Sequence, residues 1–168
     1  MDLTQNPRQA AQTPHATPHM LAAQRSSADA PREAARAAAA SGATFAAVPY
    51  SRLMGLRREA AAAGVARVRA DDDPALHDRH GCLGRAVLMA LLDTAMASAA
   101  IASVDFTHTA LTLDLSASFV ARRPGPLTAD ARVVACDERV LFCEAEVHDA
   151  GGAPVARGRG CFRLVPHA

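Results

Sequence analysis

The sequence predicts an α+β fold in which a meander of long antiparallel strands wraps around one long buried helix. Two observations carry this prediction. Residues 81–102 form an apolar run that is opened by glycines and contains one carboxylate, Asp93. From Phe106 onward the hydrophobic period changes from helical to two, which is typical of half-buried antiparallel strands.

Length and composition limit the classes of protein to consider. The chain has 168 residues, half of them apolar, which suffices for one domain with a sizeable core. Its 18 basic and 17 acidic side chains leave a net charge of +1, which argues against nucleic acid or an acidic membrane surface as a partner. The four cysteines show no CxxC spacing and the first residues show no secretory signal, so we expect a reduced, cytoplasmic protein.

The N-terminal quarter has a different composition from the rest. Residues 1–44 mix Gln, Pro, Ser, Thr and Ala without an apolar period, which predicts a flexible tail ahead of a domain spanning residues 45–168. Residues 31–40 have high helix propensity, but they contain no large apolar side chain with which to dock. Any helix there should therefore be marginal.

The first half of the predicted domain leads up to the long helix. Residues 51–63 favour a helix by propensity, residues 65–69 a short strand, and residues 71–79 a polar loop. The apolar helix then runs to about Ala102. Although it approaches the length of a membrane span, it is rich in Ala and contains Asp93, which favours a buried helix over a membrane helix.

The second half of the domain is predicted to be sheet. Four strands are expected, over residues 111–119, 127–133, 140–148 and 155–165. In the first strand the buried face is predicted to consist of Leu111, Leu113, Leu115, Ala117 and Phe119. In the last strand Ala156, Gly158 and Gly160 share one face, and such small residues permit a helix to press closely on the sheet.

Three stretches carry a resemblance to a known family: Val87–Met96, Leu113–Phe119 and Pro126–Val134. Together they resemble the hotdog-fold thioesterases, in particular the phenylacetate-pathway type of acyl-CoA thioesterase. The resemblance implies a short helix over residues 49–54 and a first strand over 56–61. We adopt these in place of the helix favoured by propensity, because the tertiary contacts of a sheet often override local preference.

The resemblance also implies a site. In such enzymes a carboxylate, here Asp93, acts as nucleophile or general base toward the thioester carbonyl. The family has a His and two Gly where this chain has Gly84, Arg85 and Ala86, and it has an amide side chain where this chain has Asp78. It further implies a homodimer or homotetramer whose sites lie between two subunits, with no cofactor.

Physical chemistry leaves alternatives open at each of these positions. Apolar surroundings make Asp93 a better base or nucleophile, but the same residue could be a structural Asp held by backbone N–H groups or by an Arg. The backbone N–H groups of Gly84, Arg85 and Ala86 could polarise a carbonyl oxygen, or they could simply begin a helix. Asp78 opposes charge build-up nearby unless it is protonated or paired with Arg79 or Arg85; otherwise it holds a water or serves as a loop residue.

Further polar residues lie near these positions. His80 is an alternative site residue, as is Cys82, while the spacing of His and Cys in this loop fits no strong metal-ligand pattern, so no metal is predicted. Arg122 and Arg123 could bind the phosphates of coenzyme A, or they could belong to a charged outer sheet face. The acidic turn at residues 137–138 replaces the Gly-Arg pair usual in the family.

Three functions therefore follow from the sequence, the third and remotest being a structural oligomer that binds no small ligand. The first is hydrolysis of an acyl-CoA or similar acyl thioester, with Asp93 as the reacting carboxylate. The second is a catalytically silent hotdog domain that binds an acyl thioester or another apolar ligand. The altered positions Gly84 and Asp78, together with the acidic turn, support the second.

Overall fold

The computed structural model describes residues 30–167, which form three α-helices, one 3₁₀ turn and six strands. In chain order the helices and strands are α1 (Ala30–Ala47), α2 (Pro49–Leu53), β1 (Leu56–Ala62), β2 (Val65–Ala70), α3 (Arg85–Ala102), β3 (His108–Phe119), β4 (Leu127–Asp137), β5 (Val140–His148) and β6 (Pro154–Pro166). The 3₁₀ turn, Pro74–Leu76, lies in the loop between β2 and α3.

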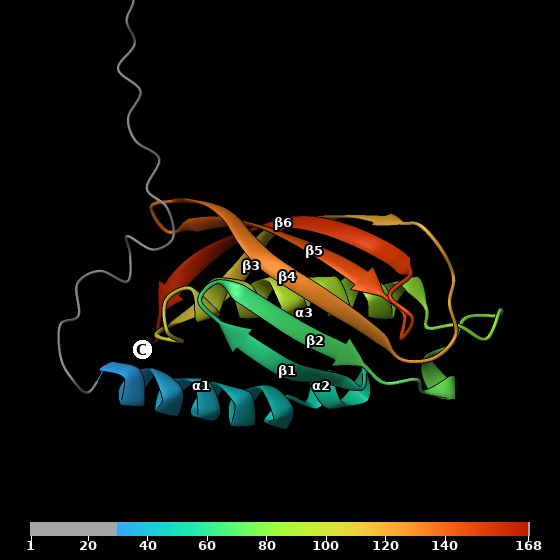
Figure 1. The fold of residues 1–168 in the computed structure, drawn as a ribbon, viewed down its shortest axis with the longest axis horizontal. Helices are drawn as coiled ribbons and strands as arrows, with labels where there is room; N and C mark the ends of the chain where they lie inside the picture. Colours follow the sequence, from blue (N-terminus) through green and yellow to red (C-terminus); the bar gives the residue numbers. More distant parts are fainter. Residues whose placement is uncertain (1–29, 168) are drawn as a thin grey trace, which may run out of the picture.

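The six strands form one antiparallel sheet in the order β1-β2-β4-β5-β6-β3. The helix α3 lies against one face of this sheet and contacts all six strands (Figure 1). This confirms the predicted architecture of a long helix covered by a meander of antiparallel strands. The strand from residue 140 to 148 has the predicted bounds, and the other three predicted strands extend beyond theirs by a few residues.

The core of the fold is centred on α3. Eleven of its 18 residues are buried, among them Leu91, Leu92 and Met96, which are fully enclosed. By length and composition α3 could span a membrane, but 61% of it is buried by the surrounding sheet and it occupies the position of a core helix. The prediction of a buried helix is therefore confirmed for α3.

The small residues of β6 allow α3 to approach the sheet closely, as the sequence predicted. A Cβ atom on Gly158 would lie 3.2 Å from the methyl carbons of Leu92 and 3.3 Å from the carbonyl oxygen of Ser116. Glycine is therefore needed at this position because a side chain would push the helix away from the sheet.

One predicted face is wrong in its first half. Leu111 and Leu113 are 50% and 57% exposed, although the alternating pattern placed them in the core. The register between β3 and β6 shifts between Thr112 and Asp114, which is the signature of a β-bulge. The extra residue reverses the alternation, so Thr112 shares the helix-facing side with the buried Phe162, its partner on β6.

The segment before β2 follows the family-based prediction rather than the propensity of the sequence. The helix α2 stops at Leu53, Gly55 adopts a φ of 62°, and β1 then pairs with β2. A helix through residues 51–63 is therefore wrong. The pairing partner and the burial of Leu56 in the core decide the outcome, because both stabilise a strand here.

The helix α1 crosses the predicted boundary between residues 44 and 45 and rests on β1. Its docking contact comes from Phe45, which lies just beyond the alanine-rich stretch. The guanidinium of Arg58 sits between the rings of Phe45 and Phe106 and also donates a 3.0 Å hydrogen bond to Ser41. Residues 1–29 of the predicted tail lie outside the described residues, and the division into tail and domain stays a prediction.

Candidate active site

Asp93 lies near the middle of α3 and is half-buried. The hydroxyl of Thr112 on β3 donates a 2.8 Å hydrogen bond to its Oδ1 atom. Within residues 30–167 no Arg, Lys or His forms an ion pair with Asp93. The carboxylate is therefore neither sealed in the core nor neutralised by a cation of its own described chain.

Tyr50 of α2 is an electrostatic neighbour of this carboxylate that the sequence did not single out. Burial raises the pKa of the Tyr50 phenol, and the negative charge of Asp93 raises it further. The side chain is 46% exposed, so it stands at the surface beside the helix. Asp93 thus has a hydroxyl on β3 bonded to it and a phenol on α2 within its electric field.

The start of α3 supplies two candidate donors rather than the three that the sequence suggested. The N–H of Gly84 donates to the carbonyl oxygen of Leu76 at 2.9 Å and is therefore already engaged. The N–H groups of Arg85 and Ala86 have no hydrogen-bond acceptor among the described residues. They are the first N–H groups of a helix and carry the positive end of its dipole, which suits them to a developing negative charge.

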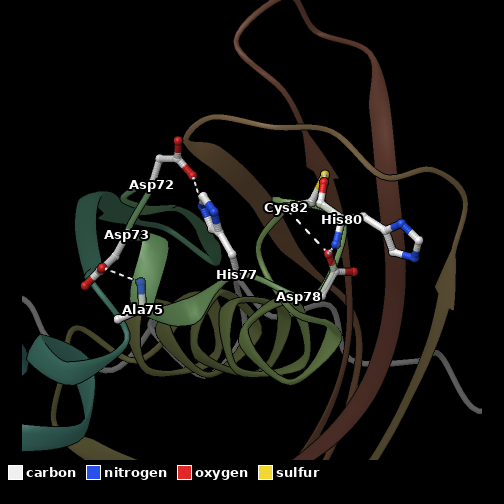
Figure 2. A network of polar contacts seen from close by, with 7 residues as sticks. All are labelled: Asp72, Asp73, Ala75, His77, Asp78, His80 and Cys82. Atoms are coloured by element: carbon white, nitrogen blue, oxygen red, sulfur yellow. Dashed lines mark hydrogen bonds and ion pairs between the residues drawn. The ribbon is translucent and has the colours of Figure 1, made fainter.

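Asp78 is held by its own loop, as Figure 2 shows. Its Oδ1 accepts N–H bonds from His80 at 2.8 Å and from Cys82 at 3.4 Å. The bond from His80 is the main reason why the pKa of Asp78 lies below its usual value. The charged partner is Arg122, at 3.3 Å, rather than the expected Arg79 or Arg85.

The two histidines of this loop have different surroundings. His77 bonds through Nε2 to the carboxylate of Asp72 at 2.7 Å. His80 accepts a 3.1 Å bond from Arg79, and Figure 2 shows its ring turned away from the other labelled side chains. Neither histidine is bonded to Asp93, and no group of metal-binding side chains occurs in the described part of the chain.

A cavity of about 240 Å³ brings together four of the predicted site residues. Asp78, Arg85, Arg122 and Arg123 all line it, as does the alternative site residue Cys82. Three of these are ion-paired: Arg122 with Asp78, and Arg123 with Asp149 at 3.5 Å. The guanidinium of Arg85 lies 5.2 Å from the ring centre of Phe119. Asp93 is not among the lining residues, so the structure divides the predicted site into two parts.

A larger hollow of about 1090 Å³ lies on the sheet face opposite α3. Its polar lining consists largely of ion pairs between neighbouring strands, including Arg67 with Asp130 at 2.7 Å and Arg157 with Glu146 at 3.1 Å. Because it contains none of the predicted site residues, we do not place the chemistry there.

A family model of the thioesterase superfamily matches residues 80–156, from the loop before α3 to the beginning of β6. A conserved protein of Pseudomonas aeruginosa is 32% identical to this chain with a TM-score of 0.67, and the match covers 70% of this chain and 94% of that one. The chain belongs to the thioesterase superfamily.

Two more distant structures share the fold. A thioesterase family protein of Silicibacter pomeroyi is 20% identical with a TM-score of 0.71, and the match covers 80% of this chain and 99% of that chain. A thioesterase of Haemophilus influenzae is 16% identical with a TM-score of 0.67, covering 73% and 87%. No curated protein matches the sequence. The hotdog fold expected from the sequence is thereby confirmed.

Within this thioesterase fold, the candidate donors and the candidate carboxylate share one face of α3. Ala86 and Asp93 are seven residues apart, which corresponds to two helical turns and about 10 Å along the axis. A reacting carboxylate and the donors to the carbonyl oxygen must both lie within about 3 Å of the group they act on. Within one chain, these two candidate half-sites are therefore too far apart to act on the same carbonyl.

Proposed function

We propose that this protein hydrolyses an acyl-CoA or a similar acyl thioester, with Asp93 as general base or nucleophile. The observation that carries the proposal is the half-buried carboxylate itself, which has no cationic partner among the described residues, in a chain of the thioesterase superfamily. A lone carboxylate in an apolar helix is costly unless something compensates it. Proton transfer from water, or direct attack, gives this residue a function.

In the general-base form of the reaction, Asp93 takes a proton from water while the water oxygen adds to the thioester carbonyl carbon. The carbonyl oxygen becomes negative and is stabilised by the N–H groups of Arg85 and Ala86. The carbon–sulfur bond then breaks, and the thiolate recovers the proton. This chemistry requires neither a metal nor a redox cofactor.

The proposal includes a homodimer, which can assemble further into a homotetramer. Because the two half-sites are about 10 Å apart in one chain, the helix start of one subunit would act with Asp93 of its partner. The outer edge of β3 is unpaired among the described strands and carries the exposed Leu111 and Leu113. This edge is where we place the second copy, because a free strand edge is a template for pairing.

The structure provides fewer contacts from which to infer the thiol carrier than from which to infer the reacting carboxylate. Arg122 and Arg123 are about half-exposed at the cavity and could meet the phosphates of coenzyme A, with His80 nearby in the same loop as Asp78. Each arginine already has a carboxylate partner, so a phosphate would have to share or replace it. The three sequence stretches that resemble the phenylacetate-pathway type support an acyl-CoA substrate. The four cysteines of the chain are free thiols in the structure, which supports a reducing, cytoplasmic location.

Turnover of a panel of acyl-CoA substrates by wild type and by Asp93→Asn tests the proposal. We expect the substitution to lower kcat by at least about 100-fold, because it removes the acid–base or nucleophilic group. Asp114→Asn is the matched control, since Asp114 pairs with Cys161 on the opposite face of β3 and β6. Equal rates for wild type and Asp93→Asn would refute the proposal.

A second candidate is a silent domain that binds an acyl thioester or another apolar ligand without cleaving it. The lowered pKa of Asp78 favours it, because this group stays anionic near the start of α3, where a negative carbonyl oxygen would have to form. Tight binding of acyl-CoA without turnover, measured by calorimetry, is the expected result for this candidate.

A further inference from the structure

The β-bulge in β3 determines which side chain meets Asp93. Before the bulge Ala110 and Thr112 pair with Leu164 and Phe162, both of which are buried on the helix side of the sheet. After the bulge Leu115 pairs with Gly160 on this same side. Leu113 is the extra residue, and without it the alternation of β3 would place a different side chain beside the helix.

The contact between Thr112 and Asp93 joins the edge strand to the helix. The hydroxyl oxygen lies 2.8 Å from Oδ1, which is a normal length for a hydrogen bond to a carboxylate. Within residues 30–167 no other hydrogen bond to the Asp93 side chain occurs. One carboxylate oxygen is therefore fixed by β3, while Oδ2 has no partner among the described groups.

We propose that Thr112 is a positioning residue for Asp93: its hydroxyl holds Oδ1 so that Oδ2 is presented to the water or to the thioester. The inference rests on the proposed function and gives the two oxygens different roles: Oδ1 accepts the hydrogen bond and Oδ2 reacts. Thr112 gains or loses no proton in the reaction. It donates the same hydrogen bond before and after Oδ2 accepts the proton of water.

The physical reason is the freedom of an unanchored carboxylate. An Asp side chain on a helix rotates about two torsions, and each productive encounter requires one oxygen to point at the reacting atom. A hydrogen bond from a stiff β-branched side chain on a paired strand removes much of this freedom. A small displacement of a catalytic group lowers the rate constant of the chemical step considerably. We therefore expect the contact to affect kcat more than substrate binding.

The test uses steady-state kinetics of Thr112→Val, which keeps the shape of the side chain and removes the hydroxyl. We expect kcat to fall roughly 10- to 100-fold with KM changed by less than about threefold. Thr112→Ser, which keeps the hydroxyl, should retain most of the wild-type kcat. Thr128→Val is the matched control, because Thr128 lies on the interior strand β4, away from Asp93 and from the β3 edge, and should leave both constants unchanged.

A double-mutant cycle separates this inference from the proposed function. Adding Thr112→Val to Asp93→Asn should cause little further loss, because the hydroxyl acts through the carboxylate. A wild-type kcat for Thr112→Val, with Asp93→Asn inactive, would overturn the positioning role and leave the proposed function standing. Equal losses for Thr112→Val and Thr112→Ser would also overturn it, whereas an active Asp93→Asn would remove the proposed function itself.

Discussion

Two carboxylates near the start and middle of α3 have opposite surroundings, and we expect them to have different roles for this reason. Asp78 accepts two backbone N–H bonds and lies beside Arg122, so its charge is satisfied locally and it organises the loop. Asp93 receives one hydroxyl bond and no cation from its own described chain. A carboxylate whose oxygen atoms already have hydrogen-bond and ion-pair partners interacts weakly with a substrate, whereas one oxygen of Asp93 has no partner among the described residues.

The first prediction concerns the pH dependence contributed by Asp78. Because the pKa of Asp78 is lower in the folded protein, its contribution to stability is present above about pH 4, the ordinary value for Asp. It is lost as the pH falls through the lowered value. Asp78→Asn should therefore lose less stability than wild type as the pH falls below about 4, measured by urea unfolding at each pH. Identical acid profiles of the two proteins would contradict this role.

At the scale of elements, the packing of β6 against its neighbours depends on its small residues. Gly160 is the most restricted position, because an added Cβ would lie 2.9 Å from the ring of Phe162 and 3.0 Å from the carbonyl oxygen of Asp114. The second contact is with the backbone of β3, which cannot move without disturbing the strand that carries Thr112.

Substitution of Gly160 by Ala should therefore destabilise the fold by about 1–3 kcal/mol through overpacking. Gly42→Ala is the matched control, since an added Cβ in the middle of α1 would have no heavy atom within 4 Å. There the change should be neutral or stabilise the helix by up to about 1 kcal/mol. Urea denaturation midpoints of the two variants measure the difference, and equal effects at both positions would contradict the packing argument.

One guanidinium adds to the docking of α1 that Phe45 provides. Arg58 is placed between two aromatic rings, and its partial desolvation lowers its pKa. Arg58→Met keeps an apolar stem but removes the cation–π contacts and the bond to Ser41. We expect faster proteolysis and faster hydrogen exchange within α1, with the core strands unaffected. Arg57→Met, which removes only an exposed pair with Asp71, should leave α1 protected.

At the scale of the whole molecule, the two edges of the sheet differ. The first edge strand, β1, is contacted by α1 and α2, whereas among the described elements the main contacts of β3 are with α3 and β6. A long, open edge with exposed leucines is a site at which another chain can add. The same edge borders Asp93, so pairing there would bring a second copy to the candidate site.

Leu113→Lys should consequently weaken self-association and lower turnover together. The charge would be buried without a partner in a β3 interface, which disfavours the assembled state. Val65→Lys on β2 is the matched control because Val65 is 53% exposed, close to the 57% of Leu113, and lies on an interior strand. Sedimentation velocity and steady-state rates measure both effects. A monomeric Leu113→Lys variant with full activity would refute the shared-site arrangement.

The sequence by itself predicted the elements whose patterns are local. The apolar run gave α3, the change to a period of two gave the strands, and the glycines of β6 indicated a close helix contact. It also indicated Asp93, because a carboxylate in an apolar helix costs free energy unless it is paired or has a function. Whether that residue is catalytic is still a prediction.

Only the tertiary structure decided the remaining features, because they depend on groups that are distant in sequence. The bulge at Leu113 arises from pairing with β6 and turns Thr112 rather than the leucines toward α3. The engagement of the Gly84 N–H by Leu76, and of Asp78 by Arg122, likewise depends on how the loops fold back. Periodicity fixes which residues can form a helix or a strand, whereas register and loop packing decide which side chains meet.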